Sequence, residues 1–176
     1  MQLLPGKEGV KRVTSLISEK HQVHAYAVEL TAKQICNLNP TGQVDFGGSE
    51  YIAAEPRPVP THKKHSQDRY QWWSLAHGAY LVEFNEVISL APNEIALLEP
   101  HERLLRAGAT HAVQFLRGYS DPLSTLLNVV AARMEIKQNA RIATLRVYRL
   151  PGLKPPLGVA KTKSAKKKSA KKKRKR

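Results

Sequence analysis

One carboxylate in this sequence, Asp121, is a candidate catalytic group. It lies in the segment Gly118-Tyr119-Ser120-Asp121-Pro122. Glycine tolerates positive φ, and Pro122 keeps the residue before it out of the α region, so the segment predicts a tight turn. A carboxylate held there beside the Tyr119 hydroxyl could orient a water molecule. A lone Asp in a turn more often accepts hydrogen bonds from its own backbone, and we favour that structural role.

Two histidine pairs share the same spacing, His21 with His24 and His62 with His65. A zinc site needs three or four ligands with supporting second-shell contacts, and no cysteine pair accompanies either histidine pair. The sequence therefore predicts no metal site. The single cysteine, Cys36, is expected to be a small buried hydrophobic side chain in a reducing compartment.

The aromatic segment Tyr70 to Trp73 could offer a platform on which a nucleic-acid base stacks. Adjacent residues of a strand point to opposite faces, so at most one of Trp72 and Trp73 can lie in the core. Core packing or a subunit contact is the favoured interpretation.

The C-terminal segment carries most of the excess charge. Residues 154–176 contain twelve basic residues and no acidic one, whereas residues 1–153 contain 17 basic and 14 acidic residues. Such a low-complexity cationic segment cannot build a core, and it is expected to be disordered unless a polyanion such as RNA orders it. The predicted nucleic-acid-binding residues are Lys161, Lys163, Lys166, Lys167, Lys168, Lys171, Lys172, Lys173, Arg174, Lys175 and Arg176.

The 176 residues are enough for one hydrophobic core. We expect a folded domain over residues 1–150, a proline-rich linker over 151–160 and the basic tail over 161–176. No stretch has the apolar length of a membrane span or of a signal peptide, so a soluble cytoplasmic protein is expected.

Short strands separated by Pro, Gly and Asn dominate the first 150 residues. In residues 79–85, Tyr80, Val82 and Phe84 fall on one face of a strand. Residues 70–98 as a whole are strand-like, and strands are also predicted on either side of the Gly118–Pro122 turn. The other predicted strands cover residues 21–30, 43–54 and 141–150, and Gly47 and Gly48 indicate a bulge.

Helical patterns are few. Residues 10–17 and 31–38 each favour a short helical segment, and residues 99–106 give the clearest helix, with Pro100 at its first position and Gly108 closing it. The expected architecture is mainly β, a barrel or sandwich with one or two short helices.

Four pieces, in this order, resemble the dUTPase/dCTP deaminase superfamily, especially its deaminase-like branch: Val44–Gly48, Glu99–Arg106, Gly118–Pro122 and Arg141–Leu145. The resemblance runs from about residue 44 to residue 150. It implies a distorted β-barrel, commonly trimeric, with nucleotide sites between subunits.

Most of the phosphate-binding and catalytic residues of that family are replaced in this sequence. Pro100 to Arg103 stand where the family has Gly-Arg-Ser-Ser, so the phosphate-binding serines are lost, and Glu102 would repel a triphosphate if it faced the site. No carboxylate occurs from Leu123 to Met134, where the deaminases carry their catalytic Glu. Thr144 replaces a glutamine, and only Asp121, Tyr119 and Asp45 remain.

The leading hypothesis is therefore a non-catalytic RNA-binding component of a ribonucleoprotein. A ribosomal protein of the large subunit fits best, built on a degenerate dUTPase-like fold and contacting rRNA and neighbouring ribosomal proteins. No cofactor is expected, and a family-like homotrimer is allowed but not favoured. The alternative is a divergent dUTP diphosphatase or dCTP deaminase of nucleotide metabolism that uses Asp121 and Tyr119.

Overall fold

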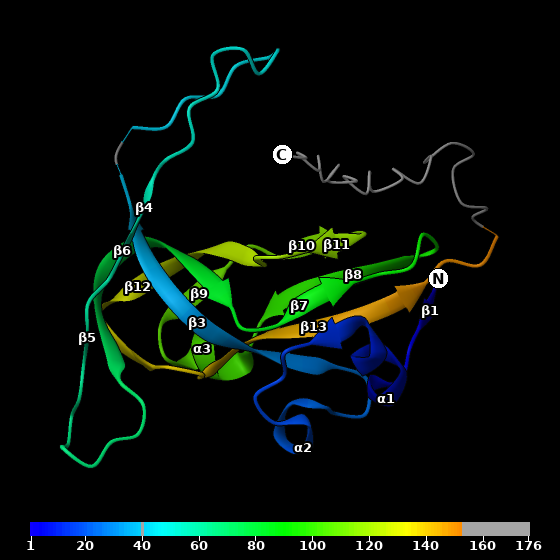
Figure 1. The fold of residues 1–176 in the computed structure, drawn as a ribbon, viewed down its shortest axis with the longest axis horizontal. Coiled ribbons are helices and arrows are strands. Elements are labelled where there is room, and N and C mark those ends of the chain that lie inside the picture. The colour runs from blue at the N-terminus through cyan, green and yellow to red at the C-terminus, as the bar shows by residue number, and fades with distance from the viewer. Residues whose placement is uncertain (40, 153–176) are drawn as a thin grey trace, which may run out of the picture.

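The computed structural model describes residues 1–39 and 41–152, which form one strongly curved, half-closed sheet with short helices beside it (Figure 1). The central path of the sheet runs β10-β8-β13-β3-β6-β12-β9. Its members are β3 (Val28–Leu38), β6 (Trp72–Phe84), β8 (Glu94–Pro100), β9 (Ala109–His111), β10 (Gln114–Leu116), β12 (Ser124–Lys137) and β13 (Arg141–Arg149). The predicted mainly-β architecture is confirmed, with the sheet curled into a half-barrel instead of a closed barrel.

Shorter elements extend this sheet and cover one end of it. β1 (Gln2–Leu3) pairs with β13, β4 (Pro56–Pro58) with β3, and β5 (Thr61–His62) with β6. A second, three-stranded sheet joins β11 (Tyr119–Ser120), β7 (Val87–Ser89) and β2 (Val13–Thr14). The helical elements are α1 (Gly6–Gly9), the 3-10 turn η1 (Val10–Arg12), α2 (Glu19–Gln22) and α3 (Glu102–Arg106).

Alternating burial along the long strands builds the core. On β12, Leu127 and Val129 are buried while Leu126 and Val130 point outward. Tyr80, Val82 and Phe84 on β6 are buried as predicted. Burying large apolar side chains contributes roughly 1.5–3 kcal/mol each, so this shared interior holds the strands together. The fully buried side chains include Trp73, Leu30, Ile35, Leu98, Leu127 and Leu145.

Four local predictions are wrong. The strand predicted over residues 21–30 is wrong in its first part, because residues 21 and 22 belong to α2 and β3 begins only at Val28. Residues 31–38, predicted as a helical turn, belong to β3, because this central strand pairs with β6 on one side and with β13 and then β4 on the other. Residues 10–17 form η1 and the short strand β2 instead of a helix. Residues 43–54 form an exposed loop with one isolated bridge, Gln43 to Ile52.

The predicted helix of residues 99–106 is confirmed with a shifted start. Pro100 ends β8, His101 is the N-cap, and α3 follows. Gly108, at φ +87°, closes this turn as expected. No helix among residues 1–39 and 41–152 is long and apolar enough to span a membrane. The basic residues from Lys161 to Arg176, and the predicted linker beyond residue 152, lie outside the described residues, so the domain boundaries stay predictions.

Candidate functional site

A cleft of about 370 Å³ opens beside the start of α3, and we call it the α3 cleft. Three neighbouring inner strands, β3, β13 and β8, form its floor, and the segment before β3 and the start of α3 border it. Its lining residues are His24, Ala27, Glu29, Glu99, Pro100, His101, Glu102, Leu105, Thr144 and Arg146.

Strand register places two carboxylates on either side of one hydroxyl. Thr144 on β13 is directly opposite Glu29 of β3 and directly opposite Glu99 of β8. Residues opposite one another in paired strands share a face of the sheet. Since neighbouring strands lie about 4.8 Å apart, the backbones of Glu29 and Glu99 are separated by roughly 10 Å across the cleft floor.

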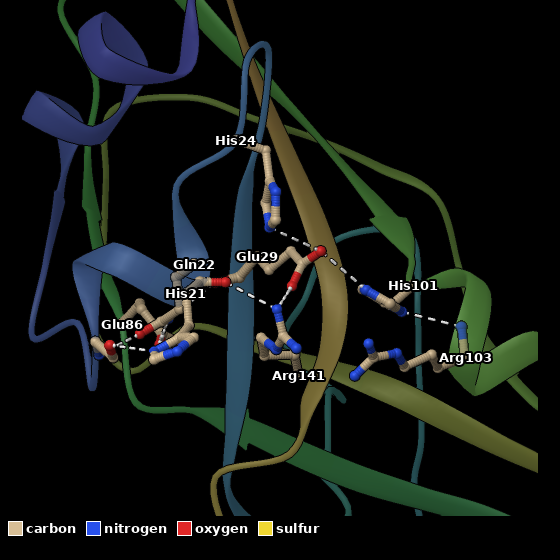
Figure 2. A network of polar contacts seen from close by, with 9 residues as sticks. His21, Gln22, His24, Glu29, Glu86, His101, Arg103 and Arg141 are labelled. Atoms are coloured by element: carbon tan, nitrogen blue, oxygen red, sulfur yellow. Dashed lines mark hydrogen bonds and ion pairs between the residues drawn. The ribbon is translucent and has the colours of Figure 1, made fainter.

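Glu29 is the hub of the polar contacts (Figure 2). Its Oε1 accepts from His101 Nε2 at 3.0 Å and lies 3.1 Å from His24 Nε2, and its Oε2 accepts from Arg141 Nη1 at 2.6 Å. Burial raises the pKa of the Glu29 carboxyl, but the hydrogen bond from His101 and the nearby positive charges outweigh this and leave the pKa lowered. Glu29 is therefore held as a carboxylate.

A buried network underneath anchors the backbone of this site. Gln22 Nε2 donates to the Glu29 carbonyl oxygen at 2.9 Å and to Glu86 Oε1 at 2.7 Å. Glu86 also accepts from the amide and hydroxyl of Thr31, at 2.9 and 2.7 Å. These contacts tie α2 to β3, so the segment after α2, which carries His24, is fixed beside Glu29.

Gly6 brings the N-terminal helix against that segment. The Gly6 amide donates to the Ala25 carbonyl at 2.8 Å, and a Cβ at Gly6 would collide with the His24 carbonyl oxygen. Only glycine allows this approach. The position of His24 is thus set by α1 as well as by α2.

The acidic side chains of the cleft are matched by arginines. Arg146 forms an ion pair with Glu99, Arg141 with Glu29, and Arg106 with Glu102 at 2.5 Å. Glu102, predicted to repel a triphosphate, borders the cleft but is exposed and paired with a cation. The site is therefore close to charge-balanced before the histidines are counted.

The turn at Gly118–Pro122 forms as predicted but lies outside the cleft. Gly118 has φ +65°, and the Tyr119 hydroxyl donates to Asp121 Oδ2 at 3.0 Å, which raises the pKa of Tyr119. Tyr119 is exposed, and no residue of this turn lines the α3 cleft. The contact printed for the Asp121 carboxylate comes from the Tyr119 side chain, so its structural role within the turn stays a prediction.

The other sequence candidates are scattered. Asp45 lies in the exposed 43–54 loop, where the Ser49 hydroxyl contacts it at 3.4 Å. His62 and His65 lie at the surface, and within the described residues no three His, Cys, Asp or Glu side chains are placed to hold a metal ion. Cys36 is buried as predicted, and burial raises the pKa of its thiol.

The two tryptophans divide as the strand alternation predicted. Trp73 is 2% exposed in the core, whereas Trp72 is half-buried on the opposite face, with Lys64 Nζ 3.9 Å from its ring centroid. The preference for core packing is confirmed for Trp73.

Sequence reasoning missed the centre of the site. Glu29 was contained in a predicted strand, and its charge within an otherwise apolar run was the one available signal. His24 was considered only as a metal ligand. His101 was considered only as a replacement within the helix segment, not as its N-cap and a partner of Glu29.

No protein-family model matches the chain. It is 33% identical over 138 residues to a protein of Methanosarcina mazei named probable deoxyuridine 5′-triphosphate nucleotidohydrolase, a match that covers 76% of each chain. A protein of Methanosarcina acetivorans with the same name is 34% identical over 133 residues, 73% of each chain.

Among solved structures, the fold is similar to the 2′-deoxycytidine 5′-triphosphate deaminase from Agrobacterium tumefaciens. The TM-score is 0.60 at 14% sequence identity. The match covers 83% of this chain and 48% of the deaminase, so the chain spans about half the length of that protein.

These similarities overturn the leading hypothesis of a ribosomal, RNA-binding protein with rRNA and ribosomal proteins as partners. They favour the alternative, nucleotide metabolism. The prediction of a ribosomal protein was wrong because it was based on the positive charge of residues 154–176 and not on residues 1–153. Residues 1–153, with 17 basic and 14 acidic side chains, have no strong excess charge of their own.

Proposed function

Because this chain belongs to the dUTPase/dCTP deaminase superfamily, we propose that it hydrolyses deoxyuridine 5′-triphosphate to the monophosphate and pyrophosphate. The observation that carries this proposal is the 33% identity, over 76% of the chain, to a protein named as a deoxyuridine 5′-triphosphate nucleotidohydrolase.

The α3 cleft is the proposed substrate site. Its volume of about 370 Å³ is within the range of small-molecule pockets, roughly 300–1,000 Å³. The Arg146 guanidinium and the Thr144 hydroxyl on its floor can donate to phosphate oxygens. An arriving triphosphate would compete with Glu99 for Arg146, so binding would exchange one ion pair for another.

His24 is the proposed base that activates water. Its Nε2 lies 3.1 Å from Glu29 Oε1, so the carboxylate favours a proton on Nε2 and leaves Nδ1 as the basic nitrogen. Nδ1 makes no hydrogen bond to the described residues, and the side chain is 47% exposed at the cleft. A carboxylate that fixes the tautomer of a histidine base is a recurrent catalytic arrangement.

Deamination of dCTP receives less support. The likeness to the solved deaminase is one of fold alone, at 14% identity. On β12 the only carboxylate is Glu135, which is paired with Lys64 and Arg133 and lies outside the α3 cleft.

Self-association is the proposed assembly state, because the family places nucleotide sites between subunits. Leu126 and Val130 point outward from one face of β12 and are 52% and 61% exposed. A charge at Leu126 should weaken the oligomer. We expect Leu126→Lys to reduce the molar mass in solution measured by light scattering, and an unchanged mass would argue against this face.

The activity test uses the full chain with dUTP, dCTP, dTTP and UTP, with and without a divalent cation. Pyrophosphate and ammonia are measured separately. The proposal requires pyrophosphate from dUTP in preference to the others. Asp121→Asn, at the exposed turn, should keep this activity, whereas Arg146→Gln should weaken it.

A further inference from the structure

A hairpin projects from the end of β3 and β4, away from the body of the sheet (Figure 1). The Asn39 amide donates to the Glu55 carbonyl oxygen at 2.9 Å, and Gln43 and Ile52 exchange two backbone hydrogen bonds of 2.9 Å. We call residues 41–55 the arm. Because these bonds continue the pairing of β3 with β4, the arm holds its tip away from the rest of the described chain.

The tip of the arm exposes large apolar side chains. Val44 is 85% exposed, Phe46 is fully exposed, and Tyr51 and Ile52 are 60% and 54% exposed. Single apolar side chains are common on protein surfaces, but four of them within residues 44–52 are typical of an interaction site. The arm therefore offers apolar surface that the described part of its own chain does not cover.

The arm is also acidic. Residues 41–55 contain Asp45, Glu50 and Glu55 but no lysine or arginine. None of these three carboxylates forms an ion pair with a described residue. A partner that covers the arm must therefore combine apolar surface with positive charge.

The basic C-terminal segment meets only one of these two conditions. Residues 161–176 are rich in lysine and arginine, but they contain no apolar side chain larger than alanine. Such a segment could neutralise the carboxylates of the arm, but it would leave the exposed side chains at the tip in water.

The surface around β10 meets both conditions. Val113, Phe115 and Arg117 alternate along this end strand of the sheet and its flanks, so they point to the same side, and all three are exposed. Leu97 of β8 is directly opposite Phe115 and half-buried, which extends the apolar surface. Arg117 forms no ion pair with a described residue. We call these four residues the β10 patch.

We propose that the arm of one copy of this chain docks on the β10 patch of a second copy. Phe46 packs against Phe115, and Glu50 pairs with Arg117. Since Phe46 is fully exposed in the single chain, this contact forms only between copies. It joins two different surfaces, so each copy offers its arm to the next, and a ring forms if the rotation closes. The contact is separate from the outward face of β12 and does not depend on the proposed hydrolysis.

The test cross-links two cysteine variants of the full chain, Val44→Cys and Val113→Cys, with a short bismaleimide. Both substitutions keep Phe46 and Phe115 in place. The native Cys36 is 3% exposed, so it stays unmodified in the folded protein. We expect covalent dimers when the two variants are mixed and far fewer with either variant alone, because a head-to-tail contact does not bring identical positions together.

A matched position and a charge exchange sharpen the result. Tyr26 is 60% exposed but lies outside the β10 patch, so Tyr26→Cys mixed with Val44→Cys should give no dimers. Glu50→Lys added to the Val44→Cys chain should slow cross-linking by about tenfold, as should Arg117→Glu added to the Val113→Cys chain. Mixing these two charge-reversed chains should restore the rate.

The proposal is overturned if the mixture gives no dimers, or if its yield equals that of either variant alone or of the Tyr26→Cys mixture. A charge exchange that fails to restore the rate also overturns it. The cross-link reports only on positions 44 and 113, whereas pyrophosphate release tests hydrolysis and the molar mass of Leu126→Lys tests the β12 face. Each of these proposals can therefore fail while the others stand.

Discussion

His101 joins Glu29 to the first turn of α3. Its Nδ1 accepts from the Arg103 amide at 2.9 Å, so Nδ1 carries no proton, and its Nε2 donates to Glu29 Oε1 at 3.0 Å. One neutral imidazole thereby caps a helix and holds a carboxylate of the adjacent strand. The orientation of Glu29 and the position of α3 are coupled through this side chain.

His101→Ala should lower the free energy of unfolding by about 2 kcal/mol, because it removes both an N-cap and a hydrogen bond to a carboxylate. An asparagine at this position can still cap α3 but is too short to reach Glu29. The free energy of unfolding of His101→Asn should therefore decrease by about half as much as that of His101→Ala. Urea unfolding of the two variants measures this. Equal stability of the alanine variant and the wild type would contradict the proposed coupling.

Glu86 should make stability depend on pH in the sense opposite to Glu29. Burial raises the pKa of Glu86, although the donors of Thr31 and Gln22 oppose it. The folded state then holds this proton more tightly, so its stabilising contribution is complete below the unfolded pKa of about 4.3 and is lost as pH rises through the folded value.

The free energy of unfolding of the wild type minus that of Glu86→Gln should therefore decrease as pH rises from about 4 toward neutrality. For Glu29, whose folded pKa is lowered, the stabilisation is present above the unfolded value and lost as pH falls. The free energy of unfolding of the wild type minus that of Glu29→Gln should therefore increase as pH rises through the acid range. Urea titrations at a series of pH values test both signs, and two parallel curves would contradict the assignment.

Gly108→Ala should destabilise the protein more than Gly118→Ala. Both glycines have positive φ, +87° and +65°, so both substitutions carry the strain of a left-handed residue, about 1–2 kcal/mol. At Gly108 the new Cβ would also lie 2.8 Å from the Cβ of Ala131, whereas space is open at Gly118. Thermal unfolding should show Gly108→Ala/Ala131→Gly recovering the difference between the two single variants but not the shared strain.

His24→Gln should reduce kcat for dUTP by about 10²-fold or more, the usual contribution of a general base, with a smaller change in KM. His21→Gln is the matched control, because His21 lies nearby but its ring contacts Ser18 instead of Glu29. Initial rates of pyrophosphate release give both constants. A His24→Gln enzyme with wild-type kcat would assign water activation to another group.

The sequence predicted those features of the fold that depend on local residue patterns. Alternation identified the buried face of residues 79–85, Gly108 marked the end of α3, and the Gly118–Pro122 turn formed where expected. The same patterns failed at residues 31–38, where pairing with three neighbouring strands outweighs local helix preference.

The candidate site could not be predicted from local patterns, because the register of the paired strands brings its residues together. Glu29, Glu99 and Thr144 are up to 115 positions apart in the chain and meet only when β13 pairs with β3 and with β8. No spacing in the sequence encodes those pairings. The charge of the C-terminal segment, by contrast, is evident from the sequence. That charge led to the RNA-binding hypothesis, which residues 1–153 do not support.

The most direct measurement of the central claim is the products formed when the full-length wild-type chain is incubated with dUTP. We expect dUMP and pyrophosphate in equal amounts, at a rate proportional to protein concentration. Recovery of the dUTP intact, with the protein shown to be folded, would contradict the proposed hydrolysis.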